Sequence, residues 1–270
     1  MVLLDCGVLR CILTGVMRTM GCIFKKSSAS LVTNEYGIRE SFRKISVRTV
    51  TADVIFVPGD GAEAKVVCHE KAEAKHRVAV EEDTLIIDGL SERKWYHNIG
   101  CRCKKAKVTI IIPKGEYHAL NVKNTTGNVE IPGGFAFGNA DISVTTGDIS
   151  WRDSAVGDLD CKSTTGDVNL TDIQCDALIA TGTTGDLKMR NVIAAGKMTI
   201  HRVCGHVEFE ACDASEVSVR VTTGDVKGTL LSDKTFEAKS TTGKVEVPRS
   251  RPGGLCKVHT TTGRIDIDIQ

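Results

Sequence analysis

The residues best suited to bind a metal ion are aspartates that follow a recurring glycine. Four copies of the tripeptide Thr-Thr-Gly are followed at once by an aspartate: Asp148, Asp167, Asp186 and Asp225. On neighbouring strands these carboxylates would stand about 5 Å apart, and a Ca²⁺ ion could bind between them. Other copies carry different residues at this position: Asn128, His206, Lys244 and Arg264. The sequence therefore favours a structural role, in which each aspartate accepts backbone N–H groups in its own bend.

A second candidate metal site lies in a non-repetitive stretch. Trp95-Tyr96-His97 is followed by Cys101 and Cys103, and an imidazole with two thiols could bind zinc or another soft metal ion. The Cys-x-Cys spacing differs from that of paired zinc knuckles, and Lys104 and Lys105 would repel a cation. The alternative is a loop that packs its aromatic side chains. We predict no metal site and no cofactor.

The sequence contains no recognisable catalytic motif. It has no nucleophile motif, phosphate-binding loop, metalloprotease helix or dinucleotide fingerprint. Four histidines have no evident Ser or Cys partner: His69, His76, His118 and His206. A polysaccharide-acting enzyme would need paired carboxylates in a groove walled by long loops, and the regular repeat spacing leaves no room for such loops. We therefore predict a protein without catalytic residues.

Basic residues recur four positions before the repeated glycine. They are Lys123, Lys162, His201, Arg220, Lys239 and His259. Acidic residues recur three positions after it, as Glu130, Glu208, Glu246 and Asp266. The basic face could bind an acidic polymer or form an ordinary solvated surface. The paired threonines are predicted to form hydroxyl ladders between strands, with recognition of ice or sugars as the alternative.

A repeat positions all of these residues. Thr-Thr-Gly occurs seven times and an eighth copy is degenerate, Val203-Cys204-Gly205, with successive glycines 19 or 20 residues apart. Apolar residues recur seven and five positions before the glycine and two and four positions after it, with mostly polar residues between. This alternation is typical of half-buried strands. The apolar residues lie at odd distances before the glycine and at even distances after it, which one continuous strand would not allow. The chain must therefore bend at the glycine, which accepts a positive φ.

Two architectures satisfy this pattern. In a β-solenoid the equivalent strands stack in parallel, whereas in an antiparallel meander each Thr-Thr-Gly-Asp is a hairpin turn. The strict spacing favours in-register stacking. We predict an all-β fold, a single-stranded parallel β-helix (β-solenoid) of about eight rungs, in which each repeat of 19–20 residues is one rung. The N-terminal strands lack the tripeptide and would form a β cap, including a hairpin of Val78–Val80 with Leu85–Ile87.

The predicted organisation has four parts. Residues 1–24 form an apolar N-terminal segment, which reads as a degenerate or truncated membrane anchor because it contains Asp5, Arg10 and Arg18. Residues 25–40 are predicted as a linker, because they begin with a run of small and polar residues. The N-terminal β cap would occupy residues 41–118, and the solenoid repeats residues 119–270.

The composition limits the partners and the compartment. The chain has 35 basic and 34 acidic residues, and this balance argues against a nucleic-acid partner. Aromatic residues make up only 4%, which weakens a stacking platform for sugars or bases. The 11 cysteines are an odd number and do not align on adjacent rungs, so we predict free thiols. Free thiols favour a reducing compartment, or an exported protein of an anaerobic organism.

The repeats resemble those of a bacterial putative adhesin family, in which a domain of unknown function is built of β-strand repeats. The resemblance is carried by copies such as Ser163-Thr164-Thr165-Gly166-Asp167-Val168 and by the start Phe42-Arg43-Lys44-Ile45-Ser46-Val47. It covers about residues 36–270. Family members are similar in having an N-terminal membrane anchor before a β-repeat domain outside the membrane, and the charges in residues 1–24 depart from that pattern. The resemblance implies no catalytic residues.

We expect a non-enzymatic, adhesin-like or scaffold protein of the cell envelope. Its repeated rigid faces would bind an unknown surface ligand, a glycan or a protein, through weak contacts that add along the stack. Membrane association would come through residues 1–24, and no nucleic-acid partner is expected. The alternatives are a polysaccharide-acting β-helix enzyme and an intracellular structural or regulatory scaffold in the cytoplasm.

Overall fold

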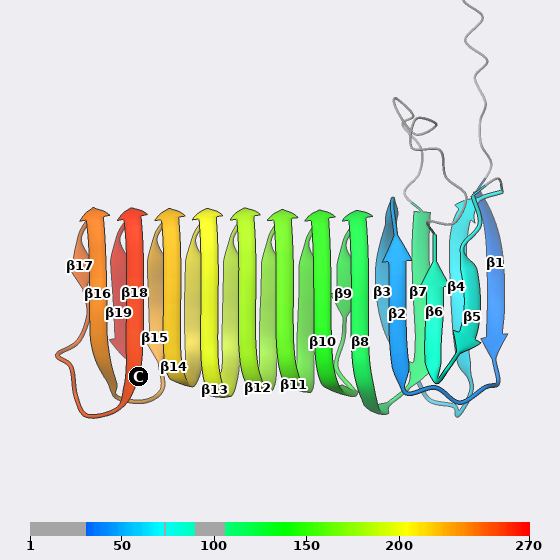
Figure 1. The fold of residues 1–270 in the computed structure, drawn as a ribbon, viewed down its shortest axis with the longest axis horizontal. Coiled ribbons are helices and arrows are strands. Elements are labelled where there is room, and N and C mark those ends of the chain that lie inside the picture. Colours follow the sequence, from blue (N-terminus) through cyan, green and yellow to red (C-terminus); the bar gives the residue numbers. More distant parts are fainter. Residues whose placement is uncertain (1–30, 73, 90–105) are drawn as a thin grey trace, which may run out of the picture.

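The computed structural model describes residues 31–72, 74–89 and 106–270, and these residues form an all-β fold (Figure 1). The first seven strands are β1 (Leu31–Ile38), β2 (Lys44–Thr49), β3 (Ala52–Gly59), β4 (Ala64–Lys71), β5 (Arg77–Glu81), β6 (Thr84–Asp88) and β7 (Ala106–Pro113). The next seven are β8 (Gly115–Thr126), β9 (Val129–Ile131), β10 (Phe135–Thr146), β11 (Ile149–Thr165), β12 (Val168–Thr184), β13 (Leu187–Cys204) and β14 (Val207–Thr223). The last five are β15 (Val226–Leu230), β16 (Lys234–Thr242), β17 (Val245–Glu246), β18 (Gly254–Thr262) and β19 (Ile265–Ile269).

Successive repeats stack in parallel and in register. Between β11 and β12, for example, Ile149 pairs with Val168, and Cys161 pairs with Ala180. Figure 1 shows the result as two layers, with β8, β10 and β18 in front and β9, β15 and β19 fainter behind. The parallel pairing confirms the predicted solenoid-like stack and contradicts the antiparallel meander. We call one repeat, from one Thr-Thr-Gly corner to the next, a rung.

Each Thr-Thr-Gly corner requires glycine for two separate reasons. Gly166 has a φ of 135°, which side chains other than glycine rarely adopt. A Cβ added there would also lie 2.1 Å from the carbonyl oxygen of Gly147 on the preceding rung. The corners are stacked so closely that the backbone of one leaves no space for a side chain on the next.

A second bend occurs on the opposite side of each long strand, and we did not predict it. It falls six positions after the glycine, at residues with φ between 50° and 54°: Asp153, Asp172, Asn191 and Ala211. This bend changes which side chains point inward, so Ser154 and Val156 are buried as well. Asp and Asn adopt positive φ more readily than most residues, and their recurrence was the available signal.

The core lies between the two layers. In one rung the inward side chains Val168, Leu170, Leu178 and Ala180 are all fully buried. Each buried aliphatic side chain contributes about 1.5–3 kcal/mol relative to exposure. The predicted inward columns are therefore confirmed in the inner rungs, where they hold the two layers together, whereas Val245 in the end rung is 38% exposed.

The last two repeats do not stack in chain order. β18 lies between β14 and β16, and β19 lies between β15 and β17. The orange β16 and β17 consequently end the stack in Figure 1, with the red C-terminal strands one rung inside. This arrangement arises because near-identical repeats can pair in more than one order.

The N-terminal strands continue the stack and then change direction. β2 pairs in parallel with β8, and β3 pairs in parallel with β9 and β7. Beyond them, β4 is antiparallel to both β7 and β1. The predicted hairpin is confirmed as β5 and β6, with Glu82 and Asp83 at positive φ in its turn.

The predicted linker, residues 25–40, is corrected over residues 31–38. These residues form β1, which pairs along its whole length with β4. The edge of β4 satisfies the backbone groups of β1, and Tyr36 and Ile38 pack against the core. The polar run Thr33-Asn34-Glu35 obscured this strand in the sequence.

Arg202 is a charged side chain enclosed in the stack without a hydrogen-bond partner among the described residues. Arg202 is fully buried, and a Cβ added at Gly182 on the preceding rung would lie 1.9 Å from its Nη1. None of its three guanidinium nitrogens has a hydrogen-bond partner among the described residues. Burial lowers the pKa of this guanidinium from its ordinary value. A buried charge without a partner destabilises a fold.

The cysteines of the described residues are free thiols, as predicted: Cys68, Cys161, Cys175, Cys204, Cys212 and Cys256. Cys204 is exposed and the other five are buried. Burial raises the pKa of Cys161 and of Cys256 to about 12. These thiols therefore act as small core side chains.

The described residues include no helix with the length and hydropathy of a membrane span. The predicted anchor, residues 1–24, lies outside the described residues.

Candidate functional site

The aspartates that follow the corner glycines form a ladder along the stack. The Oδ1 atom of Asp148 accepts the backbone N–H of Asp167 at 2.9 Å, and Oδ1 of Asp167 accepts that of Asp186 at 2.8 Å. Asp53 and Asn128 continue the ladder toward the N-terminus, and the ring nitrogen Nδ1 of His206 continues it in the other direction. Each side chain therefore bonds the next rung, and our prediction of a bond within its own bend was wrong.

This ladder explains the residue types without a metal ion. In a parallel stack each N–H that follows the corner points along the stack axis, toward the side chain of the neighbouring rung. Any short side chain with an acceptor atom can bind it, which is why Asn128 and His206 occur in place of aspartate. The carboxylates that suggested calcium are thus used as structural acceptors.

A column of four basic residues crosses the front strands β13, β14, β18 and β16, close to the C-terminal end of each strand. In spatial order it contains His201, Arg220, His259 and Lys239, and we call these four residues the basic column. Each is paired in register with the next, so the side chains start about 4.8 Å apart. Within the described residues none of the four forms an ion pair. The two permanently charged residues, Arg220 and Lys239, stand two rungs apart with His259 between them, so their backbones are about 9.6 Å apart.

Elsewhere on the stack, charges of opposite sign lie on neighbouring rungs. Arg190 pairs with Glu210 at 2.7 Å, and Lys197 pairs with Glu216 at 2.6 Å. The basic column departs from this arrangement. Glu237, two residues before Lys239, is already paired with Lys257 at 3.2 Å. Among the described residues, the column therefore places Arg220 and Lys239 on one face without an ion-pair partner.

A shallow hollow lies along the basic column. It has a volume of about 710 Å³, and its lining includes Arg220, Lys239 and His259 together with Thr222 and Thr261. The hydroxyl groups of the Thr-Thr pairs make no hydrogen bonds among the described residues, so the predicted hydroxyl ladders do not form. The exposed hydroxyls next to the column can instead donate to an anion.

A second groove crosses the rungs at the other end of the front strands. It has a volume of about 720 Å³, and small or apolar residues such as Ala136, Ala155 and Ile193 line it. Its carboxylates, Glu116 and Asp176, come from β8 and β12, which are three rungs or about 14 Å apart at strand spacing. They do not converge as the carboxylates of a glycosidase would.

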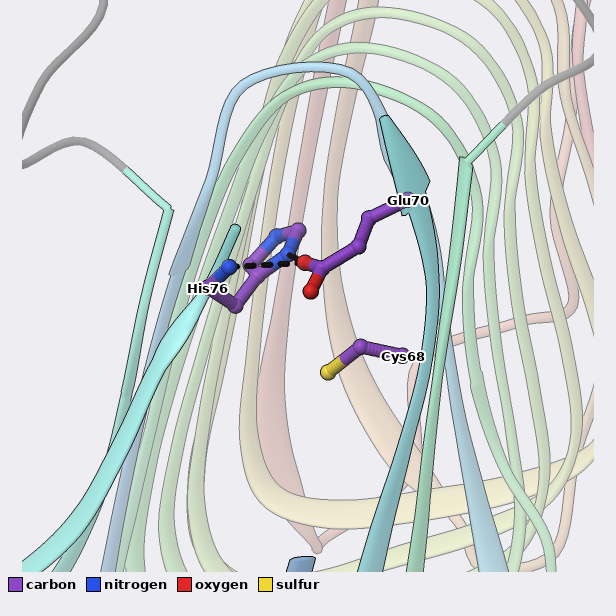
Figure 2. Close-up of side chains that lie close together, drawn as sticks. All are labelled: Cys68, Glu70 and His76. Carbon is purple, nitrogen blue, oxygen red and sulfur yellow. Dashed lines mark hydrogen bonds and ion pairs between the residues drawn. The ribbon is translucent and has the colours of Figure 1, made fainter. Parts of the chain in front are cut away.

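A cluster of polar side chains is buried in the N-terminal part of the fold (Figure 2). Cys68 and Glu70 point the same way from β4, and His76 follows in the connection to β5. The imidazole Nδ1 lies 2.5 Å from Glu70 Oε2, and the Cys68 sulfur lies within 4.8 Å of both ligand atoms. Burial, followed by the charge of Glu70, raises the pKa of the Cys68 thiol to about 12.

Sequence reasoning missed this cluster and proposed a different one. His76 was considered to be without a partner, because its partners lie on a strand whose inward side chains had not been assigned. The available signal was the i, i+2 spacing of Cys68 and Glu70 within a β-rich stretch. The metal candidate of His97, Cys101 and Cys103 lies outside the described residues.

The stacked parallel rungs and their glycine corners define a repetitive β-solenoid-like protein. The sequence matches the family model Toastrack DUF4097 over residues 42–192 and 173–270. The chain therefore belongs to the Toastrack DUF4097 family, and the resemblance to the putative adhesins is confirmed. A search of curated proteins finds no match.

Two solved structures share the fold. A putative adhesin from Bacteroides fragilis is 18% identical with a TM-score of 0.54, over 90% of this chain and 98% of that one. A putative lipid binding protein from Parabacteroides distasonis is 17% identical with a TM-score of 0.56, over 87% of this chain and 96% of that one. At this identity the likeness extends to the fold alone.

Proposed function

We propose that this protein is a non-enzymatic, adhesin-like protein of the cell envelope that binds an extended acidic polysaccharide. About eight rungs and an N-terminal β cap would form the rigid scaffold, and residues 1–24 would attach it to a membrane. The adhesin-like role is suggested by the name of the Bacteroides fragilis protein that shares the fold. The choice of an acidic ligand comes from the surface of this chain.

The observation that carries the proposal is the basic column. His201, Arg220, His259 and Lys239 stand on four consecutive rungs, whereas neighbouring rungs elsewhere exchange ion pairs. A polymer with one acidic group per sugar, laid along the stack axis, would neutralise the charges of Arg220 and Lys239, which form no ion pair among the described residues. The free hydroxyls of Thr222 and Thr261 would add hydrogen bonds beside it.

The expected affinity for one polymer segment is modest. An exposed ion pair contributes about 0.2–1 kcal/mol, so the ion pairs of Arg220 and Lys239 together amount to about 0.4–2 kcal/mol. Repetition of the acidic groups along the polymer raises the occupancy, because a released segment is replaced at once by its neighbour. Binding through exposed charges is screened by salt, so it should weaken as ionic strength rises.

The test compares two variants that lose the same charge from different faces. Arg220→Ser removes a residue of the basic column, and Lys188→Ser removes an exposed lysine that lies outside it. We expect immobilised polygalacturonate to retain wild-type protein and Lys188→Ser at low salt and to lose most of Arg220→Ser. A neutral glucan should retain none of them. Equal retention of both variants would contradict the proposal.

A second candidate function is the binding of an apolar chain in the groove lined by Ala136 and Ala155. The specific observation in its favour is the small, apolar lining of this groove, which could accommodate an acyl chain. The Parabacteroides distasonis protein that shares the fold is named as a putative lipid binding protein. Ala155→Arg would fill the groove, so it should abolish the binding of a fluorescent fatty acid if this function exists. Absence of saturable fatty-acid binding by the wild type would remove this candidate.

A further inference from the structure

The polar cluster of β4 is the strongest candidate for a site that the proposed function does not use. Cys68 and Glu70 are completely buried, and His76 is only 3% exposed. At the preceding inward positions the same strand carries Ala64 and Val66, which are apolar core residues. The interior thus changes from apolar to ligand-bearing within one strand, at a place where polar side chains are costly.

The carboxylate of Glu70 is held in place from several directions. Its Oε1 accepts a hydrogen bond from Asn34 Nδ2 at 2.7 Å. Its Oε2 accepts the backbone N–H of His76 at 2.7 Å and lies 2.5 Å from the imidazole Nδ1. These contacts hold the Glu70 carboxylate against the imidazole of His76, and Figure 2 shows Cys68 on the same strand as Glu70, with its sulfur apart from both.

The imidazole itself is incompletely satisfied. The other ring nitrogen of His76, Nε2, is buried and has no hydrogen-bond partner among the described residues. A buried nitrogen without a partner carries the cost of its desolvation. Nε2 lies against Gly89, where an added Cβ would be 2.7 Å from it, so a cation beside Glu70 would bind Nδ1 instead. Such a cation would compensate the buried carboxylate of Glu70.

The ligand types define which cation would fit. A thiolate, an imidazole and one carboxylate oxygen are the ligands of zinc and of chemically similar ions, whereas Ca²⁺ and Mg²⁺ prefer oxygen alone. Ligand atoms at zinc distances from a tetrahedral centre are about 3.5 Å from one another. The three atoms here lie within 4.8 Å of one another, so side-chain rotations that open the hydrogen bond between Nδ1 and Oε2 would be needed to reach that spacing.

We propose that Cys68, Glu70 and His76 form a binding site for a thiophilic divalent cation such as Zn²⁺. The thiolate, one carboxylate oxygen and an imidazole nitrogen are its protein ligands. Binding replaces the thiol proton, which is released to solvent. The ion ties β4 to the connection that leads to β5 and so stabilises the N-terminal end of the stack. This inference does not depend on the proposed polysaccharide binding.

The test uses the full chain, first freed of metal with a chelator and then titrated with Co²⁺ alone. We expect one equivalent to produce the sulfur-to-cobalt absorption and the visible bands of tetrahedral Co²⁺. Cys68→Val and His76→Gln should lose this signal, and Cys204→Ser, which removes an exposed thiol elsewhere, should keep it. The double variant Cys101→Ser/Cys103→Ser should also keep it. Absence of the bands, their retention in Cys68→Val, or their loss in the double variant would overturn the proposal.

A measurement on the wild type keeps the test valid if the core variants fail to fold. Zinc X-ray absorption of the loaded protein should show a single sulfur neighbour together with nitrogen or oxygen neighbours. Zinc should also raise the melting temperature of the wild type. A coordination shell with no sulfur or with two sulfur atoms would overturn the proposal.

Discussion

Replacing a corner glycine by alanine tests the stacking directly. In Gly166→Ala the new Cβ would lie 2.1 Å from the carbonyl oxygen of Gly147, and the residue would keep a φ of 135°. Backbone strain of this kind costs about 1–3 kcal/mol. To relieve the overlap these two rungs must separate, which weakens the bonds from Gly147 N to Thr165 O and from Ile149 N to Asp167 O. At about 0.5–1.5 kcal/mol for each bond, the total loss is about 2–6 kcal/mol.

Two further glycines separate these contributions. Gly115 has a φ of 154° with nothing within 4 Å of an added Cβ, so Gly115→Ala reports backbone strain without crowding. Gly61 has the same open surroundings without a positive φ, so Gly61→Ala should change stability by no more than about 0.5 kcal/mol.

The assay is urea unfolding followed by far-UV circular dichroism. We expect the free energy of unfolding to fall in the order Gly61→Ala, Gly115→Ala, Gly166→Ala, with the largest loss at the stacked corner. If Gly166→Ala were no less stable than Gly115→Ala, the corners would not be stacked at the distances described, and the reasoning would be refuted.

Three more predictions concern single side chains within the stack. Asp167→Ala should lower the free energy of unfolding by about 1 kcal/mol, because the N–H of Asp186 loses its acceptor. Asp167→Asn keeps an acceptor oxygen and should be nearly neutral in the same urea assay. Equal losses in the two variants would contradict the ladder. Arg202→Met should raise the free energy of unfolding by about 1 kcal/mol or more, since it replaces a buried guanidinium without hydrogen-bond partners by an apolar side chain. A loss of stability would contradict this prediction, because it would show that the charge has a stabilising partner. Burial raises the pKa of Cys161 to about 12, so the folded state keeps this proton after the unfolded state has lost it. The contribution of the thiol to the free energy of unfolding is therefore complete below about pH 9 and declines up to about pH 12. Over that range the wild type should lose about 1.4 kcal/mol per pH unit more than Cys161→Val, and parallel pH profiles would contradict this pKa.

Local features of the repeat could be predicted because each rung repeats the same physical problem. The alternation around residues such as Val168 and Leu178 identifies half-buried strands, and the glycine of Thr-Thr-Gly identifies the corner. Parallel stacking followed from the constant spacing. The free thiols followed from the failure of the cysteines to align between rungs.

The order of the rungs could not be predicted in the same way. The inward columns and corners of β16 and β18 are so similar that the sequence alone does not say which of them pairs with β14. The second bend at Asp153 was missed because it shifts the inward positions by one residue inside what looked like one continuous alternation. In β1 the single apolar residues Val32 and Tyr36 gave too short an alternation for a strand to be recognised.

The candidate sites show a related limit. The basic column was visible as a recurrence four positions before the glycine, but its lack of ion pairs depends on which charges the neighbouring rungs supply. The cluster of Cys68, Glu70 and His76 depends on the direction of side chains in β4 and in the connection after it. Such a convergence arises from three-dimensional placement and has no repeat pattern to reveal it.

The central claim is that the basic column binds successive acidic groups along the stack axis. The most direct measurement is the affinity of the wild-type protein for galacturonate oligomers of increasing length, determined by calorimetry at low salt. Affinity should rise with each added sugar until the four positions of the column are occupied and should increase only slowly beyond that length. An affinity that is independent of oligomer length, or that is matched by a neutral oligomer of equal length, would contradict the claim.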